Sequence, residues 1–239
     1  MSGHSKWATI KRKKGMIDAE RGKIFQKLTK EIYVAAKGGD PNPDNNPSLR
    51  MVVEKAKAQN MPKDRIEAAI TKASKAQGGE DYEQVRYEGY GPNGVAVMVD
   101  CLTDNRNRTA SLVRSTFTKR GGNLGTDGSV SYMFERKGII VVPNTYDEDT
   151  VMTIALENDA LDFVANDDSY EIYTDEKDFI KINEALKENG ITDLEMNEVR
   201  YIPSNYVSLD DDKKEKILGL IDTLEEIDDV QDVYHNLEI

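Results

Sequence analysis

The 239-residue sequence is poor in cysteine and histidine, with one cysteine, Cys101, and two histidines, His4 and His235. A single cysteine cannot form a disulfide within the chain, which fits a reducing compartment. The two histidines lie near opposite ends, so no zinc-ligand spacing and no cysteine–histidine or serine–histidine catalytic arrangement is present. We therefore expect no metal site, no cofactor and no enzyme.

Long hydrophobic runs are also absent. No apolar stretch approaches the ~20 residues needed to cross a bilayer. The basic segment Met1–Lys14 is not followed by the apolar run of a secretory signal. Hydrophobic residues still make up 38% of the chain, enough for a buried core. We expect a cytoplasmic protein without a membrane partner.

Charge is distributed very unevenly. The overall net charge is −12, but residues 1–77 hold 17 Lys and Arg against 8 Asp and Glu. Residues 78–137 hold 8 of each kind, and residues 138–239 hold 7 basic against 28 acidic residues. Such asymmetry predicts one end that binds a polyanion and another end that repels it.

The basic block has the pattern of three helices. Asp18 can cap a helix that ends near Lys37, and further helices are expected from Pro47 and Pro62. In the first helix the apolar residues fall on one face. The opposite face carries a stripe of lysines, which we expect to be open: Lys23, Lys27, Lys30 and Lys37. Three helices with short loops predict a small bundle.

After residue 79 the pattern changes to short strands and helices. Two strands flank Gly91-Pro-Asn-Gly94, a hairpin signal, and a helix capped by Thr103 or Asp104 precedes a strand at Ser129–Glu135. From 139 to 202 the order βαββαβ is that of the ferredoxin-like fold. The end of the chain predicts a strand near Tyr206, a helix at 211–225 and a last strand at 230–237.

These elements predict an α+β protein of three domains. A basic helical domain spans 1–79, and an acidic ferredoxin-like domain spans 137–203. The middle α/β domain at 80–136 lacks a second helix and a last strand, which residues 204–239 supply. We therefore expect the ferredoxin-like domain to be inserted into a discontinuous middle domain.

The candidate site is nucleic-acid binding and rests on the basic tract and the lysine stripe. Lysines near a helix start oppose the helix dipole, so helix stability does not explain them, whereas phosphate neutralisation does. A solvated basic tail is the alternative. Trp7 could stack on a base or anchor the tail. Arg106 and Arg108, in the first turn of a helix, could bind a second phosphate or take part in capping and a salt bridge. The candidate residues are Lys6, Trp7, Lys11, Arg12, Lys13, Lys14, Arg21, Lys23, Lys27, Lys30, Arg106 and Arg108.

Other motifs have plainer explanations. Gly121-Gly-Asn-Leu-Gly125 is more typical of a tight turn than of a phosphate-binding loop. Gly89-Tyr-Gly-Pro-Asn-Gly94 matches a dinucleotide fingerprint by letter, but a strand follows it where a helix is required. Cys101 and His235 both fit structural roles in strands.

Seven segments together resemble the YebC/PmpR family of probable transcriptional regulators, whose mitochondrial relatives activate translation. They run in order along the chain: Gly3-His-Ser-Lys-Trp7, Arg21-Gly-Lys-Ile-Phe25, Asn60-Met-Pro-Lys-Asp64, Tyr87-Glu-Gly-Tyr-Gly91, Thr103-Asp-Asn-Arg-Asn-Arg108, Gly128-Ser-Val-Ser-Tyr132 and Asp229-Val-Gln-Asp-Val-Tyr-His-Asn236. The resemblance implies a three-domain protein, with two α/β domains around a cavity, that binds nucleic acid without known catalysis. It marks the basic surface at Lys6, Lys11, Lys13, Lys14, Arg21, Lys23 and Lys27.

Three functions remain open. The first is a DNA-binding regulator of transcription, although the helices from Pro47 offer few base-reading groups and no clear helix-turn-helix. The second is a translation factor that binds ribosomal RNA or the ribosome. The third, least favoured, is a metal-dependent nuclease that uses some of the many carboxylates.

Overall fold

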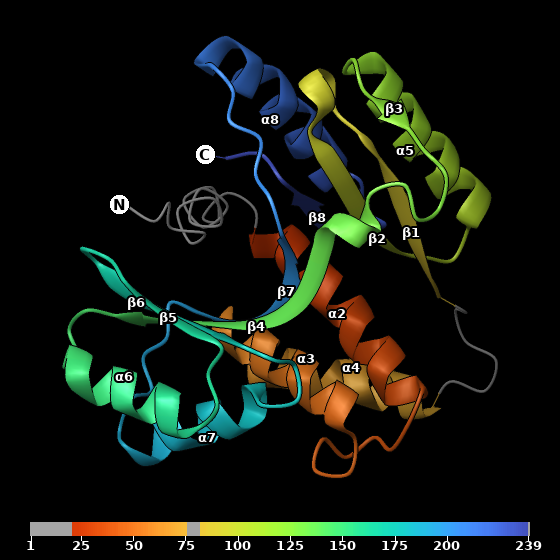
Figure 1. Ribbon diagram of the computed structural model, residues 1–239. Coiled ribbons are helices and arrows are strands. Elements are labelled where there is room, and N and C mark those ends of the chain that lie inside the picture. The colour runs from red at the N-terminus through yellow and green to blue at the C-terminus, as the bar shows by residue number, and fades with distance from the viewer. Residues whose placement is uncertain (1–20, 76–81, 239) are drawn as a thin grey trace. The chain divides into compact units, whose positions relative to one another are not determined.

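The computed structural model describes residues 21–75 and 82–238 of the chain (Figure 1). These residues form two compact units. One contains the described residues of Asp18–Phe134 and Pro203–Ile239, and the other contains Glu135–Ile202. The second unit therefore interrupts the first in sequence.

The helical bundle consists of α2 (Arg21–Lys37), α3 (Pro47–Ala58) and α4 (Lys63–Lys75). Its core is built from the apolar face of each helix, with Ile32, Leu49 and Ala56 fully buried. Asn46 caps α3, because its side chain accepts from Leu49 N at 3.1 Å and donates to Ala35 O at 2.9 Å. Capping and the apolar faces together place these helices as the sequence predicts.

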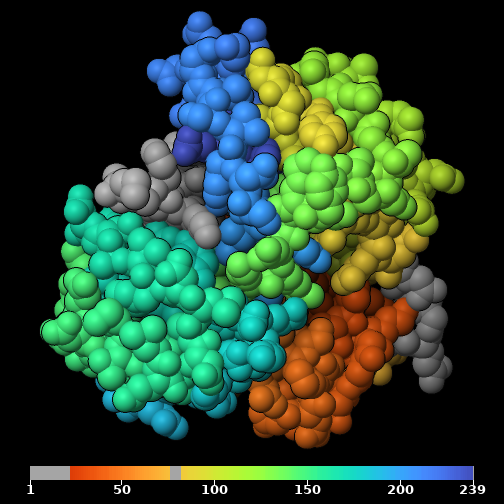
Figure 2. All heavy atoms as spheres, in the orientation of Figure 1, coloured from red at the N-terminus to blue at the C-terminus, as the bar shows by residue number. Residues whose placement is uncertain are grey.

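The middle domain is a four-stranded antiparallel sheet in the order β3-β1-β2-β8. Its strands are β1 (Glu83–Tyr90), β2 (Ala96–Thr103), β3 (Asn123–Leu124) and β8 (Val230–His235). Helices α5 (Arg106–Lys119) and α8 (Asp211–Glu225) pack their apolar residues into the same core, among them Phe117 and Leu220 (Figure 1). In Figure 2 the blue residues of α8 and the yellow residues near β1 form one continuous surface. The end of the chain thus completes the middle domain.

The other unit has the order β4 (Phe134–Pro143), α6 (Glu148–Glu157), β5 (Asp162–Ala165), β6 (Ser169–Thr174), α7 (Phe179–Glu188) and β7 (Met196–Pro203). Its sheet order, β5-β6-β4-β7, is that of the ferredoxin-like fold. Both helices pack on one face of the sheet, where Ile140 and Ile172 meet Ile154 and Ile182. The predicted α+β fold, with a ferredoxin-like domain inserted into another α/β domain, is confirmed.

One strand prediction is mostly wrong. Of Ser129–Glu135 only Phe134 and Glu135 are in a strand, at the start of β4, whereas the residues before them form a loop with a 3₁₀ turn, η3 (Ser131–Met133). The buried carboxylate of Glu88 accepts from the backbone nitrogens of Gly128, Val130 and Ser131 at 3.0, 2.8 and 2.7 Å. Those nitrogens are therefore not available to a sheet ladder.

Two smaller predictions also need correction. Asn105, rather than Thr103 or Asp104, caps α5, since its side chain accepts from Arg108 N at 3.0 Å. The strand predicted near Tyr206 is reduced to a single bridge between Val207 and Leu237.

The hairpin prediction is confirmed. The connection from β1 to β2 is a short 3₁₀ turn, η2 (Pro92–Gly94), in which Asn93 and Gly94 have positive φ values of 63° and 78°. A strand follows, so the segment is not a dinucleotide-binding loop. None of the described helices combines the length and apolar character that a membrane span requires.

Candidate nucleic-acid interface

The predicted phosphate-binding residues fall into two groups. Lys6, Trp7, Lys11, Arg12, Lys13 and Lys14, like the expected cap Asp18, lie outside the described residues. Arg21 begins α2, and its side chain is not described. Five candidates remain for structural description: Lys23, Lys27 and Lys30 on α2, and Arg106 and Arg108 on α5.

Two lysines of α2 contact the end of α8 and the turn that follows it. Lys27 Nζ donates to the carbonyl of Glu225 at 3.1 Å, and Lys30 Nζ donates to the carbonyl of Asp228 at 3.0 Å. The last turn of α8 has no basic residue of its own, so α2 supplies the cations that the negative end of a helix dipole attracts. Contrary to expectation, the lysine stripe is therefore only partly accessible to a ligand, because Lys27 and Lys30 contact other parts of the protein. Lys23 is exposed.

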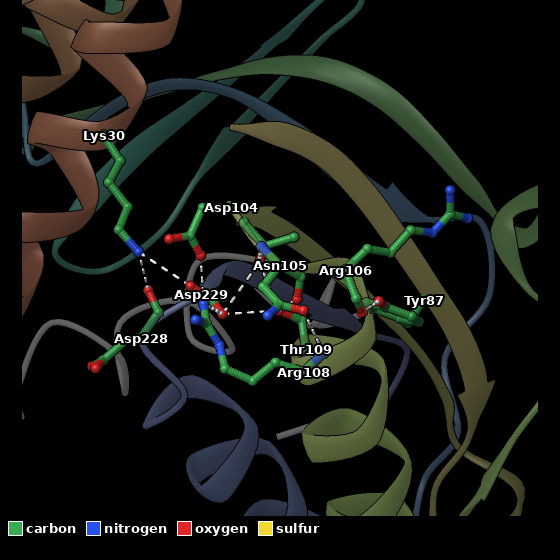
Figure 3. A network of polar contacts seen from close by, with 10 residues as sticks. Lys30, Tyr87, Asp104, Asn105, Arg106, Arg108, Thr109, Asp228 and Asp229 are labelled. Atoms are coloured by element: carbon green, nitrogen blue, oxygen red, sulfur yellow. Dashed lines mark hydrogen bonds and ion pairs between the residues drawn. The ribbon is translucent and has the colours of Figure 1, made fainter. Parts of the chain in front are cut away.

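Asp229, at the start of β8, organises the contact between the bundle and α5 (Figure 3). It is only 5% exposed. Its carboxylate accepts from Arg108 Nη2 at 2.7 Å, from Thr109 Oγ1 at 2.8 Å and from Lys30 Nζ at 3.3 Å. Two predicted phosphate ligands from separate helices thus meet at one buried carboxylate.

The ionisation of this network follows from its contacts. Burial by itself would raise the pKa of Asp229, but the hydrogen bonds from Arg108 and Thr109 and the charge of Lys30 outweigh burial and lower the pKa. The same hydrogen bond to Asp229, followed by that to Asp104, raises the pKa of Arg108. Asp229 is therefore an anion at neutral pH and holds its two cations in place.

Arg106 and Arg108 differ although they share one helical turn. Arg108 bridges Asp104, at 2.8 Å, and Asp229, so the salt bridge considered for it is present. Arg106 is exposed, and its side chain extends away from Asp229 (Figure 3). Only its backbone carbonyl is used in this network, accepting from Tyr87 Oη at 3.4 Å.

Further charged contacts join the bundle to the middle sheet. Lys55 Nζ on α3 lies 3.1 Å from Glu31 Oε2 and 3.6 Å from Asp232 Oδ2 on β8. The Lys30 ammonium also lies 5.7 Å from the ring centroid of Tyr82, within cation–π range. Beside these contacts is a pocket of ≈ 280 Å³, whose lining includes Lys23, Lys27, Lys30, Arg65, Glu226 and Asp228. Both cationic and acidic residues line it.

Three other sequence candidates have structural roles. The turn at Gly121 has φ 78°, and a Cβ on Gly122 would lie 2.8 Å from the Tyr90 carbonyl, so this segment is a tight turn. Cys101 is buried in the middle core, and burial raises its pKa to about 12, which makes the thiol unreactive. His235 Nδ1 accepts from Leu237 N at 3.3 Å within the end of β8. Among the described residues no group of three or more His, Cys, Asp and Glu is arranged to hold a metal ion.

Comparison with known proteins identifies the family. A model of the TACO1/YebC protein N-terminal domain matches residues 5–76, and a model of the TACO1/YebC second and third domain matches residues 82–237. A probable transcriptional regulatory protein of Geobacillus kaustophilus is 54% identical, with 100% of this chain and 98% of the relative covered. One from Geobacter sulfurreducens is 52% identical, with coverage of 100% and 96%.

A solved structure agrees with these matches. The crystal structure of a conserved hypothetical protein from Aquifex aeolicus is similar with a TM-score of 0.82 and 46% sequence identity. The similarity covers 93% of this chain and 92% of that one. The match extends over helical bundle, middle domain and ferredoxin-like unit alike, and the chain belongs to the TACO1/YebC family.

Proposed function

We propose that this protein is a nucleic-acid-binding regulator of transcription that contacts phosphates through its basic N-terminal domain. The observation that carries the proposal is charge segregation: 17 basic against 8 acidic residues in 1–77, followed by 7 against 28 in 138–239. An acidic protein that presents one basic domain favours a polyanion at that domain. The names of the relatives, probable transcriptional regulatory proteins, support the regulatory role.

The candidate residues divide into two kinds in this proposal. The basic tract, exposed Lys23 and exposed Arg106 are proposed to meet phosphates directly. Lys27, Lys30 and Arg108 have partners at the turn from α8 to β8. These three would bind phosphate only by exchanging those partners, so their first effect is to position α2 beside α5.

The central experiment neutralises three lysines of the basic tract and exposed Lys23, and it leaves Lys27, Lys30 and Arg108 in place. Replacing Lys11, Lys13, Lys14 and Lys23 by glutamine should weaken binding to duplex DNA and reduce the slope of log K against log salt by about 0.9 per lysine. Fluorescence polarisation over a series of salt concentrations measures both. A control with Lys177→Gln, Lys181→Gln and Lys187→Gln, on exposed residues of the ferredoxin-like unit, should bind like the parent protein. Unchanged binding in the first variant would disprove the proposal.

A sucrose gradient separates transcription from translation. The transcription proposal expects the protein at the top of the gradient, apart from ribosomal subunits. Co-migration with subunits that is lost at high salt would instead support a ribosomal RNA target bound by the same basic domain. An assay with magnesium or manganese tests the nuclease alternative, since turnover above that of a mock purification would show an enzyme.

A further inference from the structure

The outer surface of α5 is cationic. The helix has 14 residues, of which Arg106, Arg108, Arg114 and Lys119 are basic and none is acidic. All four are exposed. The chain as a whole has 44 acidic against 32 basic residues, so a helix of this composition runs against the general trend. The exposed charge therefore calls for an explanation of its own.

Helix stability explains Lys119, which lies in the last turn, where the dipole favours a cation, but it does not explain the arginines of the first turn. Among the other helices of the α/β domains, α6 begins with Glu148 and Asp149 and α8 with Asp211 and Asp212, which the dipole favours, whereas α7 has Lys181 in its first turn. In α5 the first turn holds Arg106 and Arg108 and no acidic residue. Cations at that position destabilise a helix unless an anion offsets them.

Intramolecular pairing explains only one of the four cations. Arg108 is bound to Asp104 and Asp229. Within the residues that the structure describes, the side chains of Arg106, Arg114 and Lys119 have neither a hydrogen-bond nor an ion-pair partner. Small polar side chains, Asn107 and Ser111, are exposed between them and leave room for a ligand to approach.

The position of α5 extends the basic surface of the bundle. Because Lys30 of α2 and Arg108 of α5 share the carboxylate of Asp229, the start of α5 lies beside Lys30 (Figure 3). At ~1.5 Å per residue, α5 carries positive charge about 20 Å further. The green and yellow-green residues at the upper right of Figure 2 include part of this region.

We infer that the outer surface of α5 is a second phosphate-binding surface, on which the backbone of a nucleic acid bound by the N-terminal domain continues. Arg106, Arg114 and Lys119 are its contacts. This inference rests on the proposed function and adds to it a second, separate element of the middle domain. It also gives Arg106 a role that its neighbour Arg108, tied to Asp229, does not share.

A nucleic acid fits this surface better than an acidic protein. Protein interfaces depend on buried aromatic and large apolar anchors. On α5 only Leu112 is a large apolar residue with an exposed side chain, at 43%. Phosphate contacts need cations and short polar side chains without such anchors, and this is the composition found.

The experiment compares three variants of the full chain: Arg106→Gln, Arg114→Gln and Lys119→Gln together; Lys11→Gln, Lys13→Gln and Lys14→Gln together; and the control at Lys177, Lys181 and Lys187. Each removes three positive charges. Binding to labelled duplex DNA and to single-stranded RNA is measured by fluorescence polarisation over a salt series. The α5 variant should bind at least tenfold more weakly, and its salt slope should fall by about 2.7 on duplex DNA and about 2.1 on a single strand. The control should be unchanged.

The outcomes separate the two proposals. If the α5 variant binds like the parent while the tract variant loses binding, the inference is wrong and the proposed function stands. If both bind like the parent, both fail. If polyglutamate competes for the parent protein as well as nucleic acid does, and competes less well for the α5 variant, the surface binds acidic protein and the inference is wrong. Hydrogen exchange of the unmodified chain gives an independent check, because bound nucleic acid should slow exchange in α5.

Discussion

Asp229 lies where β8 begins, and its buried carboxylate receives hydrogen bonds from α2 and α5. A buried carboxylate is costly unless it is paired and hydrogen-bonded. Asp228, the preceding residue, differs in kind: its side chain is exposed, and the bundle uses only its carbonyl. The side chains of these two adjacent aspartates should therefore contribute very differently to stability, and the same substitution at each position tests this.

We predict that Asp229→Asn lowers the free energy of unfolding by about 2–3 kcal/mol, because Arg108 and Lys30 lose the charge that holds them and an amide cannot accept from all three donors. Asp228→Asn should change stability by less than about 0.5 kcal/mol, as is usual for an exposed position. Urea unfolding followed by circular dichroism measures both. Equal effects of the two substitutions would show that the network around Asp229 contributes little.

The sequence predicts the burial of Cys101 but not that of Asp229. Cys101 lies in an apolar strand, so the sequence places it in the core, and the structure confirms this. Asp229 appeared only as part of a family segment, because a carboxylate among 44 acidic residues gives no sign of burial. Its partners come from residues 30 and 108–109, so its role depends on contacts far away in the sequence. The alternation of polar and apolar residues does not encode such contacts.

At the level of elements, the loop after β3 shows how one side chain can decide secondary structure. Glu88 on β1 is 5% exposed and binds three backbone nitrogens of residues 128–131. Burial by itself would raise the pKa of Glu88, but these hydrogen bonds together lower it. The loop is therefore fixed by an ionised carboxylate.

We predict that Glu88→Gln destabilises the protein by about 1–3 kcal/mol at neutral pH, since an amide has one acceptor oxygen where the carboxylate uses two. A carboxylate with a lowered pKa stabilises the fold above its unfolded pKa of about 4.3, and that contribution is lost as the pH falls through the folded pKa. The gap between variant and parent should therefore shrink in acid. Unfolding curves at several pH values test this, and exposed Glu83→Gln on the same strand serves as the control. A gap that is constant with pH would contradict the assigned charge.

Most elements could be predicted because their signals are local. The sequence predicts a helix from Asp211 to about Glu225, since Asp210 can cap it and an apolar face follows, and the structure confirms this helix as α8. The structure of Ser129–Glu135 could not be predicted, because it depends on a contact that is distant in the sequence. Its alternating pattern resembles a strand, but its backbone donors bind Glu88, about forty residues earlier in the chain, and no local pattern shows this.

At the scale of the whole molecule, the helical wheel of α2 correctly predicts that the lysines share one face. It does not predict that this face contacts another part of the protein. A lysine stripe predicts an open surface when the helix is considered alone. In the folded chain Lys27 and Lys30 reach the end of α8, whose carbonyls lack local cations. The sequence could have offered one clue, the acidic turn from Glu225 to Asp229, but nothing in it pairs that turn with α2.

This contact predicts how the molecule unfolds. The bundle and the middle domain belong to one compact unit, so α2 and β8 should open together, whereas the ferredoxin-like unit should open separately. Lys27→Met with Lys30→Met keeps helix propensity and the apolar stems but removes both contacts to α8. In this variant the amide hydrogens of α2 to α4 should exchange faster than those of β1 and β2. Exchange in Glu135–Ile202 should be the same as in the parent protein.

Native-state hydrogen exchange read by mass spectrometry resolves these regions. Lys63→Met with Lys75→Met is the control, because both lysines are exposed on α4 and, within the described residues, neither has a hydrogen bond or ion pair to the middle domain. If the bundle of the parent protein already exchanges independently of the middle sheet, the lysine contacts do not couple the two. If the control variant loosens the bundle as much as the test variant, charge removal alone accounts for the effect. If only the substitution of Lys27 and Lys30 uncouples the bundle from the middle sheet, then cations that were expected to bind phosphate also hold these two domains together. Bound nucleic acid and domain docking would then compete for the same side chains.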